Sequence, residues 1–556
     1  MQMTCRQCSA PFEITQDDLK FLEKVSPSFN GKKELIPSPT LCAECRWQQR
    51  HMWRDDRKLY HRKCDLTGKQ IISIYAPEKP FTVYGQKEWW GDAWDAKDYG
   101  KDFDFSRSFF EQFSELFNTV PLPSLHTEQC ENSDYGNFNW GVKDSYLIFG
   151  CDQSQDCYYG HLLFRCSDCV DCAYCKESRY CYQLLDSESC YRCFYSKELT
   201  NCDSVDFSFD CKNCRHCFGC TGLRGKEYHL FNISLQKKEY EAKLAELTLT
   251  ESTIEQARAR ALQEWEKQPR LSSHLLHCEH CSGDNLSHCK NCRDCYDGAE
   301  AQDCIRMQNI PGETKDCSEI YGAGYGAELS YQGFSVAGQR CLFSFLIYPK
   351  GNDILYSAFC GSCQNLFGCI GLKRQQYCIL NRQYAREEYE RMVPQIVDHM
   401  RKTKEWGEFF PSRFSPFAYN ESIAQEFFPL TKNQAEAGHF VWRDDDESSN
   451  YLGPSVEVPM SISSVSDDIM KQILHCEVTG RPYKIIPQEL KFYREMGIPV
   501  PRKCPDQRHS ERMALRNPRK LWKRQCAKCK KSIETTYAPE RPETVYCESC
   551  YLSSVY

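Results

Sequence analysis

The two ends of the chain are copies of each other, and this duplication constrains the fold more than any other feature. The segment RKLYHRKC at 57–64 recurs as RKLWKRQC at 519–526, and YAPEKPFTVY at 75–84 recurs as YAPERPETVY at 537–546. Both pairs are separated by the same 462 residues. Because the copies share one register, the comparison separates cysteines that a metal requires from positions that only maintain shape.

Each copy keeps a different set of four cysteines, arranged as two CxxC pairs. The C-terminal pairs are 17 residues apart, which is typical of a zinc ribbon, and the N-terminal pairs are 33 residues apart. Two such turns supply four thiolates to a tetrahedral Zn²⁺ and leave no position for a catalytic water. The sequence therefore predicts two structural zinc ions. Their ligands are Cys5, Cys8, Cys42 and Cys45 in one site, and Cys526, Cys529, Cys547 and Cys550 in the other.

The counterparts of these two quartets are incomplete. One reads Cys64, Thr67, Gly85 and Glu88, and the other reads Cys476, Thr479, Cys504 and Gln507. Both contain the pattern CxxTG, in which a hydroxyl group and a glycine can hold the turn by local hydrogen bonding. The sequence predicts that the turn survives here without a four-cysteine metal site.

The middle of the chain is rich in cysteine and is also duplicated. The stretch that begins at Cys214 matches the one that begins at Cys363, 149 residues later. Cysteines recur at intervals of three and nine, which suits either metal ligation or a β-solenoid with a repeat of about 18 residues and small buried thiols. Cys217 aligns with Leu366, and leucine can replace a buried thiol but not a ligand. This favours the solenoid.

One further group in the middle could hold a third zinc ion. It consists of two cysteine pairs seven residues apart, a short spacing that can still bring four thiols together. The candidate ligands are Cys278, Cys281, Cys289 and Cys292.

The expected fold is mixed and mainly β, with zinc-ribbon or treble-clef modules at both ends flanking a duplicated, cysteine-rich β-solenoid with two helical segments. Residues 236–268 contain no glycine or proline and are strongly helix-forming, and residues 384–404 are expected to be helical as well. The expected units are a first module with a hairpin and an aromatic acidic segment (1–129), a first solenoid half (130–235), a helical connector (236–277), a second solenoid half with its helix (278–404), a linker region (405–470) and a second module (471–556).

Two basic patches adjoin the terminal cysteine pairs. Residues 502–531 contain twelve basic and two acidic side chains, and residues 46–63 contain seven and two. Basic side chains interleaved with tryptophan can neutralise phosphates and stack on unpaired bases. The alternative is a solvated helix face whose charge offsets a dianionic zinc–tetrathiolate centre. The candidate nucleic-acid-binding residues are Arg46, Arg50, Arg54, Arg57, Lys58, Arg512, Arg516, Arg519, Lys520, Lys523 and Arg524.

Composition restricts the compartment and the kind of partner. The chain has 38 cysteines, and neither a signal-peptide stretch nor an apolar run of membrane-spanning length is evident. Cysteine excess without secretion favours reduced thiols and metal, so we expect a cytoplasmic protein with no membrane partner. The net charge of -7 argues against a globally basic nucleic-acid binder.

A resemblance to known families rests on several segments. The stretch 476–512, with PYKIIPQELKFYREMGIPVPRKCPDQRHSER, resembles treble-clef zinc-ribbon domains of bacteria and plants, although Thr479 and Gln507 replace the second cysteine of each pair. The whole chain also resembles cysteine-rich proteins of small-genome uncultured bacteria, through RKCDLTGK, DFDFSRSFFEQF, SPFAYNES and FFPLTK. This resemblance implies zinc binding and no particular activity.

The sequence contains no Walker loop, HExxH or GxSxG motif. We therefore expect a zinc-containing, non-enzymatic binding or scaffold protein. The first hypothesis is recruitment of RNA or a ribonucleoprotein through the basic patches. The alternatives are a protein-interaction scaffold that uses the solenoid sides and the acidic aromatic segment 89–105, or a solenoid-based enzyme.

Overall fold

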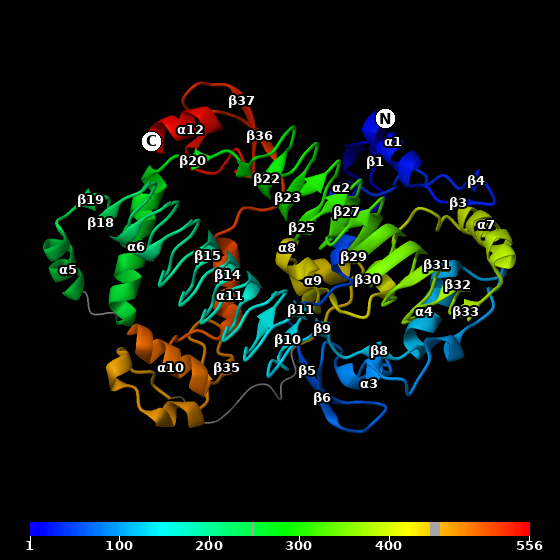
Figure 1. The fold of residues 1–556 in the computed structure, drawn as a ribbon, viewed down its shortest axis with the longest axis horizontal. Coiled ribbons are helices and arrows are strands. Elements are labelled where there is room, and N and C mark those ends of the chain that lie inside the picture. Colours follow the sequence, from blue (N-terminus) through cyan, green and yellow to red (C-terminus); the bar gives the residue numbers. More distant parts are fainter. Residues whose placement is uncertain (247–249, 445–455, 556) are drawn as a thin grey trace.

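Two stacks of short parallel strands lie side by side in the computed structural model, which describes residues 1–246, 250–444 and 456–555 (Figure 1). The first ladder spans 136–230 on the left of the view, and the second ladder spans 275–383 on the right. The N-terminal module lies along the second ladder, and the C-terminal module lies along the first. Each module is therefore packed against the ladder that is more distant in sequence.

Strands of the first ladder pair in parallel with partners 12 residues away, as His161 pairs with Ala173 and Ala173 with Leu185. Single bridges between the strands keep the same spacing, for example from Tyr158 to Val170. The repeat is thus 12 residues, and the expectation of about 18 is wrong. The strands are β10 (Gly136–Asn137), β12 (Ile148–Phe149), β13 (His161–Phe164), β14 (Ala173–Lys176), β15 (Leu185–Glu188), β16 (Asp203–Asp206), β17 (Arg215–Phe218) and β18 (Glu227–Leu230).

The second ladder follows the same plan with longer strands near its centre. Its two longest strands, β29 (Tyr331–Leu342) and β30 (Phe345–Leu355), pair in parallel with a register shift between Val336 and Gly338. The other strands on its path are β21 (Leu275–Leu276), β22 (Gly283–Ser287), β23 (Cys295–Ala299), β25 (Gln308–Ile310), β27 (Ser318–Tyr321), β31 (Cys363–Phe367), β32 (Gln376–Ile379) and β33 (Arg382–Gln383).

A period of three residues underlies the 12-residue repeat. Asp168 and Asp171 have φ angles of 52° and 54°, and a left-handed residue recurs at nearly every third position of both ladders. Such a conformation is uncommon outside glycine but is enriched in aspartate and asparagine. The chain turns at each of these residues, and the residue two positions earlier, such as Cys166 or Cys169, is buried. Four sides of three residues therefore complete one rung.

The buried thiols are satisfied by backbone carbonyl groups. The Sγ atom of Cys166 donates to the carbonyl of Phe164 at 3.6 Å and to that of Cys175 at 3.5 Å, and the same pattern recurs along the ladder. Nine residues is three sides of a rung, which brings the acceptor next to the thiol. The cysteine intervals of three and nine thus follow from packing, with free cysteine acting as a small apolar residue.

The terminal modules contain short hairpins, each followed by a helix. In the N-terminal module these are β1 (Gln2–Thr4), β2 (Pro11–Glu13), α1 (Gln16–Val25), α2 (Ala43–His51), β5 (Tyr60–Lys63), β6 (Gln70–Ser73), β7 (Val83–Tyr84) and α3 (Gln86–Trp90). In the C-terminal module they are β34 (Leu474–His475), β35 (Pro482–Tyr483), α10 (Pro487–Met496), α11 (Pro505–Ala514), β36 (Trp522–Gln525), β37 (Ser532–Thr535), β38 (Val545–Tyr546) and α12 (Glu548–Val555).

Equivalent strand pairs tie both modules to the ladders. β7 pairs in parallel with β8 (Leu122–Pro123), which leads into the first ladder. β38 pairs in parallel with β20 (Arg270–Leu271), which leads into the second ladder. β7 and β38 are 462 residues apart and β8 and β20 are 148 apart, so the two halves of the molecule are related by an approximate two-fold arrangement.

Helices follow each ladder and cover its end. α5 (Lys237–Ala245) and α6 (Glu251–Lys267) follow the first ladder, and α7 (Arg386–Lys402) follows the second. An aromatic core joins α4 (Phe109–Thr119) to the second ladder, where the rings of Phe109 and Phe367 lie 5.4 Å apart. None of the helices in the described ranges has the length and apolar character needed to cross a membrane.

Candidate metal centres

Four CxxC-type turns in the modules share one backbone geometry. In each, the carbonyl of the first cysteine accepts a hydrogen bond of 2.8–2.9 Å from the N–H of the residue four positions later, which has a left-handed φ of 60° to 70°. This holds for the intact pairs and for the CxxTG pairs alike. The donor and acceptor residues are Ser9 to Cys5, Gly68 to Cys64, Gly480 to Cys476 and Lys530 to Cys526.

Both predicted quartets are assembled. In each, the four Sγ atoms all lie within 4.8 Å of one another. Sγ of Cys8 lies 3.8 Å from Sγ of Cys42, and Sγ of Cys529 lies 3.7 Å from Sγ of Cys547. Sulfurs at about 2.3 Å from a tetrahedral zinc ion are about 3.8 Å apart, so the spacing fits the ion. The prediction of two four-cysteine groups able to hold metal is confirmed.

In each quartet, local hydrogen bonds favour one thiolate. Burial opposes ionisation of Cys526, but N–H groups of Cys529 and Cys547 outweigh it and lower its pKa to about 6. In the N-terminal quartet, a hydrogen bond from Cys45 lowers the pKa of Cys42 to about 5, and the same contact raises the pKa of Cys45. Because metal ligands must be deprotonated, the remaining thiols release their protons when metal binds.

The incomplete quartets keep the turn but replace the metal. Gly85 donates its N–H to Sγ of Cys64 at 3.3 Å, as Cys547 does to Cys526 at the same distance. A Cβ atom at Gly85 would lie 2.5 Å from the Glu88 carboxylate, which fills the space. Hydrogen bonds therefore hold this turn in place, whereas the cysteines of the intact quartet occupy the equivalent positions in the other copy.

The third cysteine set is placed differently. Each of its four thiols donates to the backbone carbonyl two residues earlier. Among the described residues they do not form a group with all ligand atoms within 4.8 Å, as the terminal quartets do. A third zinc ion therefore has no assembled site here. The bonds run from Cys278 to Leu276 (3.5 Å), Cys281 to Glu279 (3.3 Å), Cys289 to Ser287 (3.3 Å) and Cys292 to Lys290 (3.4 Å).

The N-terminal basic patch is turned inward onto the second ladder. Arg46 and Arg50 project from α2 and bind the buried carboxylate of Glu319 in β27, with Arg50 Nη1 at 3.0 Å from Oε2. Arg306 donates to the same carboxylate at 3.1 Å. Burial opposes ionisation of Glu319, but Arg46 and Arg50 hold its pKa below the usual range. The three arginines neutralise a charge that would otherwise be strongly unfavourable inside the protein.

The C-terminal patch makes the same contact with the first ladder. Arg508 and Arg512 project from α11 onto Asp171, with Nε of Arg508 at 2.8 Å and Nη1 of Arg512 at 2.9 Å from its carboxylate oxygens. The Asp171 side chain is fully buried. Arg508 and Arg512 are the equivalents of Arg46 and Arg50, 462 residues later. Each of these module helices is thus joined to a ladder by two arginines and one acid.

Further arginines of the patches are used between the ladders. Arg516 binds Asp186 of the first ladder at 3.0 Å and also Asp297 of the second. Arg519 binds Asp297 at 2.8 Å. In the other half, Arg54 binds Asp56 at 2.7 Å and stacks on Phe138, and Arg57 reaches Asp506 at 3.4 Å.

These contacts correct the expected nucleic-acid surface. The candidate arginines 46, 50, 54, 512, 516 and 519 are all occupied by buried carboxylates, and 46, 50, 54 and 512 are at most 5% exposed. Phosphates cannot reach them. The candidate lysines face outward: Lys58 pairs with Asp506 at 3.9 Å, Lys520 pairs with Glu44 at 2.6 Å, and Lys523 is exposed. The remaining candidate, Arg524, donates to the carbonyls of Ala538 and Glu543.

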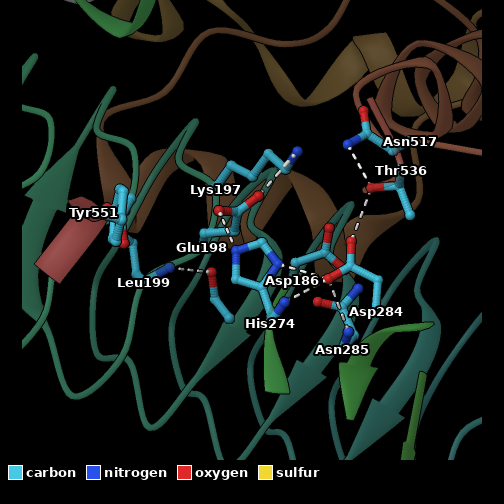
Figure 2. A network of polar contacts seen from close by, with 12 residues as sticks. Asp186, Lys197, Glu198, Leu199, His274, Asp284, Asn285, Asn517, Thr536 and Tyr551 are labelled. Atoms are coloured by element: carbon cyan, nitrogen blue, oxygen red, sulfur yellow. Dashed lines mark hydrogen bonds and ion pairs between the residues drawn. The ribbon is translucent and has the colours of Figure 1, made fainter. Parts of the chain in front are cut away.

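A second polar junction, which the sequence did not indicate, joins both ladders to the C-terminal module (Figure 2). His274 lies between Glu198 at 3.4 Å and Asp284 at 2.9 Å, and Thr536 donates to Asp284 at 3.0 Å. Burial opposes protonation of His274, but the two carboxylates raise its pKa well above the usual value. The adjoining cavity measures about 30 Å³, enough for a water molecule.

Comparison with protein-family models and with curated proteins finds no match for this chain.

Proposed function

We propose that the protein is a zinc-stabilised, non-catalytic scaffold in which metal binding in the terminal modules locks the two ladders together. The observation that carries this proposal is the position of each quartet beside a contact with a ladder. Cys45 lies in the first turn of α2, directly before Arg46 and one turn before Arg50. A metal ion that fixes Cys42 and Cys45 also fixes where these arginines reach Glu319.

The second quartet is placed in the same way. Cys547 precedes α12, whose Tyr551 donates to the buried carboxylate of Asp210 in the first ladder. Arg224 binds the same carboxylate at 2.9 Å. Apparent binding free energies of structural zinc sites are about 10 kcal/mol or more at neutral pH, and this energy is available to hold the helix in position.

The closed quartets support a structural role for zinc, because four thiolates leave no position for substrate. We infer that the two ladders are β-solenoids and that their outward sides, together with the aromatic acidic segment 89–105, bind protein partners. We place protein partners before RNA, because the arginines that would bind phosphates are bound to Glu319, Asp171 and Asp297.

Hydrogen exchange measured by mass spectrometry tests the coupling between metal and ladder. Cys42→Ser should increase exchange in α2 and in β27, although these elements are far apart in sequence. The matched variant Cys529→Ser should instead increase exchange in α12 and in the first ladder around Asp210. If both variants lose metal and β27 and the Asp210 segment keep wild-type protection, the proposed coupling is wrong.

A nucleic-acid binding assay addresses the competing hypothesis. The zinc-loaded protein should show no retention on single-stranded RNA at low salt, where electrostatic binding is strongest. Retention that is lost when Lys520 and Lys523 are both replaced by alanine would favour RNA recruitment through the exposed lysines instead.

A further inference from the structure

Three tryptophan rings surround the side-chain ammonium group of Lys373. Its Nζ atom lies 4.3 Å from the ring centroid of Trp89, 5.2 Å from that of Trp90 and 5.0 Å from that of Trp94. Nζ also donates to the carbonyl of Trp89. A cation within about 6 Å of an aromatic ring face is attracted by the ring quadrupole, and three rings at once form an aromatic cage.

The surrounding fold fixes the inner walls of the cage. Trp89 donates from Nε1 to the carbonyl of Pro121 at 2.9 Å, and Trp94 donates from Nε1 to the carbonyl of Trp89 at 2.8 Å. Trp89 is buried, whereas Trp90, at the end of α3, is 50% exposed and forms the outer wall. The cage is therefore preorganised on one side and open to solvent on the other.

The residues at the equivalent positions of the other half of the molecule differ from those of the cage. Tyr551 of α12 is the equivalent of Trp89, 462 residues later, and Arg224 of the first ladder is the equivalent of Lys373, 149 residues earlier. Arg224 forms an ion pair with Asp210, whose equivalent in the second ladder is the apolar Phe359. The second ladder thus has one ring, Phe359, where the first has a carboxylate, and Lys373 meets the tryptophans of the N-terminal module instead.

The charges near Lys373 favour a cation but do not bind it directly. Asp92 and Asp95 attract the ammonium group, while partial burial has the larger effect and lowers the pKa of Lys373. Among the residues that the structure describes, the ammonium group of Lys373, which has three N–H donors, has the Trp89 carbonyl as its one direct hydrogen-bond acceptor. A cation without N–H groups would lose less hydration on entering the same space.

We propose that Trp89, Trp90 and Trp94 form a binding site for methylated ammonium groups, which Lys373 fills in the absence of ligand. The chemical class includes quaternary ammonium metabolites and a trimethylated lysine of a protein partner. Binding requires Lys373 to move outward past Trp90. The site is independent of the zinc quartets, because the turn that precedes α3 is the one that Glu88 closes without metal.

Tetramethylammonium chloride is the probe, and its methyl signal in saturation-transfer NMR reports binding. Lys373→Ala should bind it about fivefold more tightly than the wild type, because the resident cation is gone. The double variant Lys373→Ala/Trp90→Ala should lose about fivefold of that affinity, since one ring is removed. Lys212→Ala, which removes an exposed lysine from the first ladder, is the matched control and should behave as the wild type.

Melting temperatures establish that each variant is folded. If Lys373→Ala does not fold, Trp90→Ala in the wild-type background must still weaken the wild-type signal. Choline and a peptide with one trimethyllysine then distinguish a metabolite from a protein partner by which competes better. A folded Lys373→Ala protein with no more probe binding than Lys212→Ala would overturn the proposal.

Discussion

At the scale of single residues, stability depends on a few buried carboxylates that arginines from distant segments neutralise. Glu319 and Asp171 are fully buried and each accepts hydrogen bonds or ion pairs from arginines of a module helix. Removing one partner of such a group leaves an uncompensated charge, which costs more than the intact contact contributes. These acids therefore fix where the modules sit.

Glu319→Gln should destabilise the protein by about 3–5 kcal/mol, because it leaves Arg46 and Arg50 buried without a counter-charge. The equivalent Asp171→Asn should have an effect of the same size on the other half. Urea unfolding measures both. Glu177→Gln is the control, since its ion pair with Arg165 is exposed and should contribute less than about 1 kcal/mol. Equal losses in all three variants would contradict this account.

His274 gives the stability a dependence on alkaline pH. Its pKa is raised in the folded state by Asp284 and Glu198, against the effect of burial, while Lys197, Asp186 and Arg516 lie around the same junction. A group whose pKa is raised on folding contributes its full stabilisation at pH values below its unfolded-state pKa, and this contribution is lost as the pH rises through its folded-state pKa. Between these two pKa values, the free energy of unfolding should fall by about 1.4 kcal/mol per pH unit.

The variant His274→Gln removes this titration. Its free energy of unfolding should be lower than that of the wild type at pH 6 and should decline less steeply above neutral pH. Chemical denaturation at a series of pH values measures the slope. Parallel pH profiles for the two proteins would show that His274 does not titrate between the folded and unfolded states.

At the scale of elements, the ladders and the quartets use cysteine in opposite ways. Thiols of the ladders, such as Cys169, donate to carbonyls and are sealed inside a rung, whereas Cys8 and Cys529 of the quartets are exposed. Each side of three residues turns one side chain inward, and this side chain is cysteine or serine at many positions and a larger aliphatic residue, such as Leu163 or Leu184, at others. The quartets need sulfur for its metal affinity, whereas the ladders use it as a buried apolar group.

Thiol reactivity separates these two roles. In the zinc-loaded protein, both classes should react slowly with a thiol reagent such as dithionitrobenzoate. Addition of a strong chelator should release a fast-reacting class that disappears in a variant with all eight quartet cysteines replaced by serine. The buried ladder thiols should react only on global unfolding, whereas Cys278 and Cys281 are partly exposed. Ladder thiols that react as fast as the quartets after chelation would contradict their assignment as core residues.

The sequence predicted the quartets because the two copies share one register, and a metal site is local within that register. The expected ladder repeat was wrong because cysteine intervals of nine suggested a repeat of 18. The true repeat is set by residues with a left-handed backbone conformation, such as Asp168 and Asp171, and residue type indicates this conformation only weakly. The sequence could not identify the acids that bind the patches, because Arg46 and Glu319 are 273 residues apart.

At the scale of the whole molecule, the two halves are interlocked. Each module contacts the ladder that is remote in sequence and pairs one strand with the segment that leads into the other ladder. Arg516 contacts acids of both ladders at once. Neither half can therefore complete its polar contacts alone, and we expect metal in either module to stabilise the assembly of both.

Elemental analysis of the purified protein tests the central claim most directly. The account predicts two zinc ions per chain, one in Cys42→Ser, one in Cys529→Ser, and two in the control Cys281→Ser. Absence of metal in the wild type, iron in place of zinc, or a loss of metal in Cys281→Ser would contradict it.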